Sequence, residues 1–331
     1  AWDVRAAGTV RREGSIMGHR FIAQLALNDE IEGAYLLRSA YQKTGSNGKP
    51  FLDLTIEDRS GPIDAKVWDY AGPIGMAEAG KVVWLRGRVT EFRGGLQVIV
   101  ERLRLAAEED PFDLADLVPV APIDREAAMA EIERLVASLE DADYRAVCEE
   151  MLARHGAAFR TIPAAKSVHH AFLSGLLMHT RDMLRLADFV SGLYAGTVDR
   201  SLLLAGTLLH DFGKEREFAF SDVGLVTEYA TEGQLLGHLV LGAQEVAEVT
   251  RALGTPPEKA MLLQHMILSH HGTPEFGAAV RPACAESELL SYLDLIDSRM
   301  EIYRETLSDL PVGSFSGRVF ALDCKRLYRH D

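Results

Sequence analysis

The first third of the chain alternates apolar and polar residues with a period of two, which is typical of β-strands with one buried face. We expect strands near 33–43, 50–57, 62–69, 80–91 and 95–105. The segments 45–50, 58–61 and 93–95 contain Gly, Asn or Asp and predict tight turns, because these residues tolerate positive φ. Segment 70–80 separates the third and fourth strands and has room for a short helix. Five strands with a helix at this point predict an OB-fold, a small barrel that often binds single-stranded nucleic acid.

The same alternation predicts which side chains face the barrel core. The inward set is apolar: Leu52, Leu54, Ile56, Ile63, Ala65, Val67, Val83, Leu85 and Val89. The outward set mixes aromatic and basic residues: Phe51, Lys66, Trp68, Trp84, Arg86, Arg88 and Phe92. Aromatic rings among Lys and Arg suit base stacking and phosphate neutralisation, so Phe51, Lys66, Trp68 and Arg88 are candidate substrate-binding residues. The open alternative is that the tryptophans pack against other protein, because OB-folds also serve as docking modules.

The pattern changes after the barrel. Residues 106–124 are acidic and contain three prolines, which indicates a linker. Residues 125–156 have helical periodicity in two segments, and from about residue 161 long amphipathic segments alternate with short Gly/Pro breaks. We therefore divide the chain into an N-terminal tail (1–19), an OB-fold domain (20–107), a linker with connector helices (108–160) and an all-α domain (161–331).

The composition, 47% hydrophobic and 25% charged, is typical of a globular protein and excludes a disordered tail or a coiled-coil rod. No run approaches the roughly 18 apolar residues that a membrane span needs, so we expect no membrane partner. The N-terminal residues lack the apolar core of an export signal. Cys148, Cys284 and Cys324 are far apart and odd in number, which favours free thiols in a reducing compartment. We expect a cytoplasmic protein.

The acidic charge and the histidines are both concentrated in the second half. Residues 1–110 hold 15 Lys and Arg against 16 Asp and Glu, whereas the remainder holds 20 against 33. Nine of the 11 histidines lie between His155 and His271. An acidic region repels a polyanion unless bound cations offset it. Since histidine is the commonest metal ligand, the two observations together predict a metal site in this half.

The candidate ligands lie at or near the ends of separate apolar helical segments. They are His179, His210, Asp211, His238, His270, His271 and Asp294. The His210-Asp211 pair follows the apolar run LLLAGTLL, where a buried carboxylate needs a partner. Imidazole and carboxylate ligands without a thiolate suit Mn, Fe or Zn, or Mg with fewer ligands.

These residues carry a family resemblance. The order H…HD…D with HDFGK at its centre resembles the HD superfamily of metal-dependent phosphohydrolases. The segments HHAFLSGLLMHT, LLGHLVLG and ILSHHGTPEFGAAVRP extend the similarity. With an OB-fold in front, residues from about 20 to 325 resemble the YhaM-type 3′→5′ exoribonucleases. The resemblance implies a metal core of His179, His210, Asp211 and Asp294, in which Asp211 bridges two ions that His238, His270 and His271 help to hold.

The resemblance also implies that Lys214, at the end of HDFGK, faces the phosphate during catalysis. Arg281 is a candidate phosphate clamp, with an ion pair to nearby carboxylates as the alternative. His169 and His170 are candidate substrate contacts, with packing as the alternative. We further expect Asp297 to form a hydrogen bond with a liganding histidine, and His265 to be structural or to support the ligands. We expect His19, His155 and His330 to be ordinary surface residues.

The implied activity is metal-dependent hydrolysis of single-stranded RNA from a free 3′ end, with DNA left open, releasing 5′-nucleoside monophosphates. We expect two divalent ions as cofactors, manganese first, with Fe, Mg, Co, Zn and Ni as alternatives. Two other hypotheses stay open. In the first alternative, the chain is a phosphohydrolase of a small nucleotide, and its barrel serves assembly or regulation. In the second, it is a single-strand binding protein whose helical half is only structural. The sequence leaves open whether the protein is a homo-oligomer.

Overall fold

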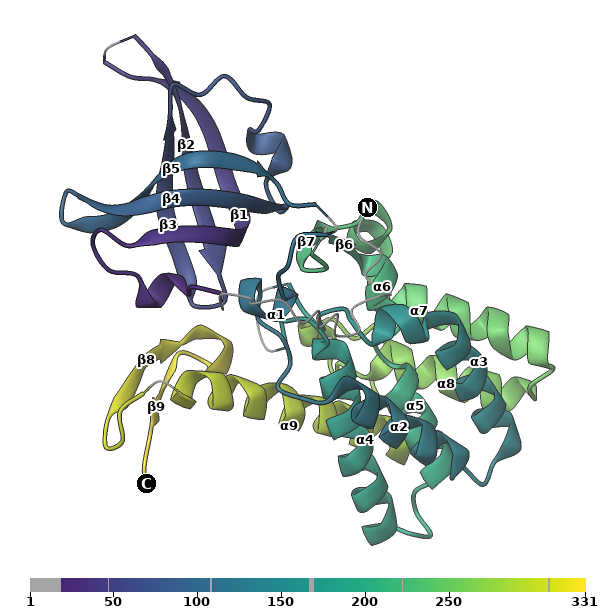
Figure 1. Ribbon diagram of the computed structural model, residues 1–331. Coiled ribbons are helices and arrows are strands. Elements are labelled where there is room, and N and C mark those ends of the chain that lie inside the picture. The colour runs from purple at the N-terminus through teal and green to yellow at the C-terminus, as the bar shows by residue number, and fades with distance from the viewer. Residues whose placement is uncertain (1–18, 47, 108, 167–169, 222, 309) are drawn as a thin grey trace. The chain divides into compact units, whose positions relative to one another are not determined.

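The computed structural model describes residues 19–46, 48–107, 109–166, 170–221, 223–308 and 310–331. Most of the predicted tail and the candidate His169 therefore lie outside the described residues. The described chain forms two compact units (Figure 1). The β-barrel unit comprises the described residues up to Val120 with Ser221, Val223 and Gly224, and the helical unit comprises Ala121–Phe220 and Leu225–Asp331 as far as they are described.

The barrel unit contains all five predicted strands. They are β1 (Glu30–Thr44), β2 (Pro50–Asp58), β3 (Gly61–Trp68), β4 (Val82–Phe92) and β5 (Gly95–Leu105). The strands close in the order β1-β2-β3-β5-β4, antiparallel except for the parallel pair β3 and β5, which is the topology expected of an OB-fold. The segment before β4 holds only the 3₁₀ turn η3 (Met76–Glu78), because Gly72, Pro73 and Gly75 interrupt any longer helix. After β5 the chain forms the short helix α1 (Leu114–Leu117).

The predicted inward residues of the barrel are confirmed. All nine named side chains are buried, and none is more than 9% exposed. On the outside, Trp68 is 52% and Phe92 50% exposed, while Phe51 and Lys66 are half-buried. The strand pattern therefore identified both faces of the barrel.

Asp58, at the end of β2, ties the start of the described chain to the barrel. Its Oδ2 accepts the N–H of Ile22 at 2.7 Å and lies 3.0 Å from Nε2 of His19, and its Oδ1 accepts the N–H of Ser60 at 2.8 Å. Burial alone would raise the pKa of Asp58, but the hydrogen bonds from His19, Ser60 and Ile22 lower it below the usual value. The expectation that His19 is a surface residue is wrong, since its side chain is only 9% exposed and pairs with Asp58.

The helical unit consists of successive helices and two small hairpins. Its helices are α2 (Arg125–Ala137), α3 (Ala142–Phe159), α4 (Gly175–Leu193), α5 (Arg200–Leu209), α6 (Lys214–Glu217), α7 (Thr231–Leu253), α8 (Pro257–Ser269) and α9 (Ala285–Ser308). Its hairpins are β6 (Phe218–Phe220) with β7 (Val226–Tyr229), and β8 (Phe315–Val319) with β9 (Lys325–Tyr328). Side chains of Asp124, Asp141 and Asp199 cap the N-termini of α2, α3 and α5, as aspartate commonly does. No helix in the described part of the chain is long and apolar enough to cross a membrane.

Helix α5 occupies the interior of this unit. Every residue from Ser201 to Leu209 is buried, and the helix packs against α3, α4, α8 and α9. Ile132 of α2 and Val147 of α3 belong to the same apolar core, so the segments that the sequence suggested as connector helices pack with the rest. Because α5 is buried along its length, the residues that follow it, His210 and Asp211, also lie inside the unit.

We expect Asp58→Ala to lower the free energy of unfolding of the barrel by roughly 2–4 kcal/mol, because it leaves buried N–H donors without an acceptor. The folded-state pKa of Asp58 is lowered, so its contribution is present above the unfolded pKa of about 4 and is lost as the pH falls through the folded pKa. Denaturant titration followed by tryptophan fluorescence measures the barrel, since all three tryptophans precede residue 85.

Asp53→Ala is the matched control on the same strand. Asp53 forms a solvent-accessible ion pair with Lys43 at 2.6 Å, and such pairs contribute about 0–1 kcal/mol. An equal loss in the two variants, or a difference between Asp58→Ala and wild type that persists in strong acid, would contradict this account of Asp58.

Candidate metal centre

The candidate ligands from the sequence converge at the end of α5. His210 and Asp211 follow α5 directly. His179 lies on α4 and Asp294 on α9. His238 lies in the middle of α7, and His270 and His271 follow the end of α8. All seven are brought together inside the helical unit. Four further elements thus meet at the end of one buried helix.

Asp211 lies between two groups of histidines. Its Oδ2 is 3.1 Å from Nε2 of His210 and 3.6 Å from Nε2 of His179. Its Oδ1 is 3.5 Å from Nε2 of His238 and 3.7 Å from Nε2 of His270. Each carboxylate oxygen therefore faces a different pair of imidazoles, which is the arrangement expected of a bridging ligand.

Asp294 and His271 complete the two groups. Oδ1 of Asp294 is 3.4 Å from Nε2 of His179, on the Oδ2 side of Asp211. The ring of His271 lies 5.1 Å from that of His238 and 4.4 Å from that of His270, centroid to centroid, on the Oδ1 side. Ligand atoms of His238, His270 and His271 all lie within 4.8 Å of one another, and the same holds for those of His179, His210 and Asp211.

Four of the imidazoles are held by a hydrogen bond at their far nitrogen. Nδ1 of His179 donates to Asp297 (2.7 Å), and Nδ1 of His210 donates to the Thr207 carbonyl (2.7 Å). Nδ1 of His238 donates to Glu217 (2.9 Å), and Nδ1 of His270 donates to the Ile267 carbonyl (2.8 Å). Carbonyl and carboxylate oxygens only accept, so Nδ1 carries the proton and Nε2 presents a lone pair to the cluster. This tautomer is the one that metal-binding histidines use.

The donor set fits a divalent cation. With both Nδ1 atoms protonated, the Nε2 lone pairs of His179 and His210 face each other at 3.2 Å, which is repulsive unless a proton or a metal cation lies between them. On the other side, Oδ1 of Asp211, Nε2 of His238 and Nδ1 of His271 are buried polar atoms that have no hydrogen-bond partner among the described residues. Leaving them unpaired costs free energy, and a cation between Oδ1 of Asp211 and Nε2 of His238, which lie 3.5 Å apart, satisfies these two atoms. Imidazole nitrogens with carboxylate oxygens suit Mn, Fe, Zn or Co.

The electrostatics favour the ligand forms of Asp211 and His270. Burial alone would raise the pKa of Asp211, but the charges of His210 and Lys214 hold it well below its usual range. Burial, together with His210 and His271, holds the pKa of His270 well below its usual range. Asp211 is therefore ionised and His270 neutral at physiological pH, as metal binding requires. Burial alone would lower the pKa of His210, but the Asp211 and Asp294 carboxylates raise it, so that in the metal-free site a proton competes with a cation for its Nε2.

His238 is positioned by a break in α7. Gly237 has φ +71° and ψ 160°, a conformation that favours glycine, and it interrupts the helix. The N–H of His238 is thereby free to donate to Oε1 of Glu217 at 3.0 Å, the same oxygen that accepts its Nδ1 proton. Gly213 of HDFGK allows the close approach, because a Cβ there would collide with the His238 carbonyl oxygen. Glu217 was not identified from the sequence; the glycine directly before a histidine in an apolar helical pattern was the available signal.

Lys214 lies at the centre, but other predicted contacts do not. Its Nζ donates to Oδ2 of Asp211 at 2.7 Å. Arg281 is exposed in the loop that leads into α9 and forms no ion pair within the described residues. His170 is buried behind His179, with its Nε2 2.9 Å from the Asp297 oxygen that His179 also uses, which favours the packing alternative. The hydrogen bond expected between Asp297 and a liganding histidine is present.

Two other histidines are structural. Nε2 of His265 accepts the N–H of Ala283 at 3.0 Å, away from the cluster. His155 was expected on the surface, and this is wrong: its ring lies between Glu215 at 2.6 Å and Glu245 at 2.7 Å. Burial lowers the pKa of His155, but the hydrogen bonds to both carboxylates raise it to about 9. His330 is exposed, as expected.

Comparison with known families agrees with this geometry. Residues 176–299 match the HD domain family, and residues 37–106 match the family described as OB-fold nucleic acid binding domain. The chain joins an OB-fold to an HD domain. The predicted fold class is thus confirmed, and the HD domain indicates a metal-dependent hydrolase.

Two solved structures that are similar to part of this chain are OB domains. One is the second OB-fold domain of replication protein A from Methanococcus maripaludis, with 18% identity over 29% of this chain and 99% of that chain, at a TM-score of 0.21. Another is an OB domain from Thermoplasma acidophilum, with 17% identity over 28% of this chain and 90% of that chain, at a TM-score of 0.21.

We expect Asp211→Ala and His210→Ala each to abolish metal binding and hydrolysis while the circular dichroism of the helices is retained. Both variants remove a group that faces the cluster and contributes little to the surrounding apolar core. Elemental analysis of the purified proteins measures the metal, and His265→Ala, which alters a histidine outside the cluster, is the matched control. Unchanged metal content in both variants would contradict the site.

Proposed function

We propose that this chain is a metal-dependent 3′→5′ exoribonuclease that releases 5′-nucleoside monophosphates from single-stranded RNA. The observation that carries the hydrolytic part is the placement of Asp211, whose two oxygens face two separate imidazole groups. Asp211 and the imidazoles on its two sides would hold divalent ions, with manganese as the first candidate, and such ions would supply Lewis-acid activation of water and charge compensation at a scissile phosphate. Polarity and the preference for RNA rest on the resemblance to the YhaM-type enzymes.

Lys214 supplies the positive charge nearest to the cluster. Its Nζ is 2.7 Å from Oδ2 of Asp211, and its side chain is 14% exposed. An ammonium group cannot ligate a cation, so in the loaded site its charge is available to phosphoryl oxygens. Arg281, exposed after the His270-His271 pair, is the second candidate for contact with a phosphate.

The outer face of the barrel supports a polymeric substrate. Nζ of Lys66 lies 4.8 Å from the ring centre of Phe92 and 5.8 Å from those of Phe51 and Trp68. We name Phe51, Lys66, Trp68 and Phe92 the aromatic face. Lys66 pairs with no carboxylate within the described residues, and half of Trp68 is exposed. Rings around a cation suit stacked bases and a phosphate backbone.

Arg88 lies in the same row of the sheet, because Lys66 and Arg88 are both register partners of Ile99. It is exposed and paired with Glu30 at 2.9 Å, so it is a weaker candidate for phosphate contact than Lys66.

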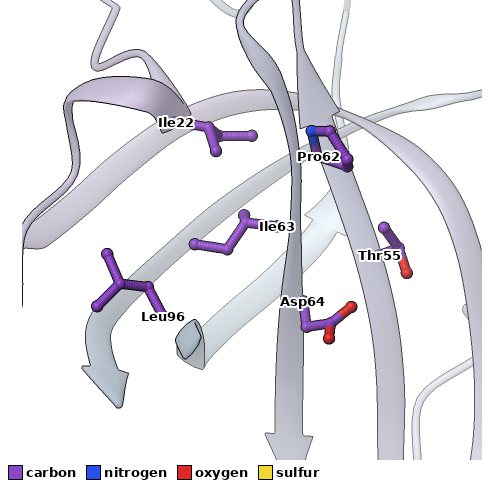
Figure 2. Close-up of a pocket in the computed structure, with 6 residues that line it drawn as sticks. All are labelled: Ile22, Thr55, Pro62, Ile63, Asp64 and Leu96. Carbon is purple, nitrogen blue, oxygen red and sulfur yellow. The ribbon is translucent and has the colours of Figure 1, made fainter. Parts of the chain in front are cut away.

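A hollow of about 370 Å³ farther along β2 and β3, where Thr55 pairs with Asp64, is less suitable for a polyanion. Figure 2 shows its lining, in which Ile22, Ile63 and Leu96 are apolar and Asp64 is acidic. No Lys or Arg lines this hollow, and phosphate contacts in nucleic-acid sites come largely from such residues. We therefore assign strand binding to the aromatic face.

The decisive assay compares linear and circular single-stranded RNA with Mn²⁺ and with a chelator. A 5′-labelled linear RNA should shorten in single-nucleotide steps and release 5′-monophosphates, a 3′-phosphate should slow the reaction, and the circular RNA should resist. Cleavage of the circle would indicate an endonuclease. Hydrolysis of dinucleotides or mononucleotides only would favour the small-nucleotide phosphohydrolase, and DNA of the same sequence tests the sugar preference.

Lys214→Ala should lower kcat about 10²–10³-fold, by analogy with the loss of one transition-state donor. Metal content should stay at the wild-type level, because the substitution removes a cation that competes for Asp211. Steady-state kinetics with parallel elemental analysis makes the comparison. A near-wild-type kcat would reject the phosphate role, and joint loss of metal and activity would make Lys214 a structural part of the site.

Phe51→Ala with Trp68→Ala should weaken binding of long single-stranded RNA by one to several orders of magnitude, since each stacked base contributes about 1–3 kcal/mol. Dinucleotide hydrolysis should be unchanged. Trp84→Ala is the matched control, an outward tryptophan eight positions before Phe92 on β4. Filter binding measures the affinity, and equal affinity of the double variant and wild type would reject the aromatic face as the strand-binding surface.

A further inference from the structure

A hollow of about 330 Å³ opens beside the Oδ1 side of the metal centre. Two candidate ligands, His238 and His271, line it together with Glu217. The rest of its wall is mainly apolar and includes Leu236, Leu239, Phe276 and Ala279. The hollow therefore lies between the Oδ1 side of the metal centre and an apolar surface, and its volume is large enough for a small molecule.

Phe276 is the prominent feature of this wall. It belongs to the 3₁₀ turn η4 (Pro274–Phe276) and is 75% exposed, and Leu236 beside the hollow is 44% exposed. The turn is held by hydrogen bonds from the Phe276 N–H to Thr273 O and from the Gly277 N–H to Pro274 O, both at 3.0 Å. Phe276 thus presents its ring to solvent from a defined backbone.

The same turn is tied to the metal centre. Gly277 has φ +101°, and a Cβ there would lie 3.2 Å from Nδ1 of His271. The turn that carries Phe276 therefore packs directly against a candidate ligand. A bound molecule whose phosphate reaches His238 and His271 has the ring of Phe276 available to it within the same hollow.

We propose that this hollow binds the terminal nucleoside of the substrate, with its base against Phe276 and Leu236 and its phosphate toward His238 and His271. The inference rests on the proposed function and assigns its specificity subsite. A base has the flat apolar face that an exposed aromatic ring binds. The ribose hydroxyls are donors, and Glu217 offers an acceptor: Oε1 holds His238, and Oε2 accepts no hydrogen bond within the described residues.

The test measures binding, not turnover, on the full chain with Mn²⁺. Isothermal titration compares 5′-UMP with ribose 5-phosphate, which has the same sugar and phosphate and no base. We expect Phe276→Ala to weaken 5′-UMP binding about 5- to 150-fold, the loss of one stacked base, and to leave ribose 5-phosphate binding unchanged. Phe276→Tyr should retain the affinity. Phe189→Ala, which removes a ring that is 67% exposed on α4, is the matched control and should bind both ligands as wild type does.

Two results would overturn the subsite. One is wild-type binding of 5′-UMP that is no tighter than binding of ribose 5-phosphate, and the other is an equal effect of Phe276→Ala on both ligands. The subsite and the proposed function fail separately. If the Phe276→Ala variant shortens RNA and binds 5′-UMP with unchanged affinity, the subsite alone is rejected. If the wild-type protein binds 5′-UMP more tightly than ribose 5-phosphate but leaves RNA intact, the exoribonuclease activity is rejected and the subsite is retained.

Discussion

The carboxylate of Asp211 is shared between two groups of imidazoles, and the helical unit is arranged to make that sharing possible. A fully buried carboxylate is costly unless positive charge surrounds it. Here Lys214 provides one positive charge, whereas the neutral imidazoles direct lone pairs toward the carboxylate and Oδ1 has no hydrogen-bond partner among the described residues, so the arrangement favours a further cation. The acidic excess of the second half of the chain is compatible with a polyanionic substrate once divalent ions occupy this centre.

The fold holds four of the candidate ligands by a hydrogen bond on the side away from the cluster. Apolar α5 carries His210 and Asp211 into the core, and backbone carbonyls of Thr207 and Ile267 fix two of the imidazoles. Glu217 and Asp297 fix two more through their carboxylates. Since a bound metal tolerates little displacement of its ligands, these outer contacts are part of the site.

Strand alternation was sufficient to predict the barrel, its inward set and its exposed aromatic residues, because each strand has one buried face. The seven candidate ligands were also accessible from the sequence, since His and Asp in apolar helical segments are unusual. Their division into two groups about Asp211 was not, because it depends on side-chain directions from five separate elements. Glu217 was missed for the same reason, as only the break at Gly237 brings its carboxylate to His238. His19 and His155 were placed wrongly because their partners, Asp58 and the pair Glu215 and Glu245, are distant in sequence.

We propose that the carboxylate of Asp211 is shared by two divalent ions. Electron paramagnetic resonance of the full chain titrated with Mn²⁺ tests it most directly, because two ions that share Asp211 are magnetically coupled. We expect two Mn²⁺ per chain at saturation and the exchange-coupled spectrum of a pair. Saturation at one ion, or two ions with the uncoupled spectrum of isolated Mn²⁺, would contradict the proposal.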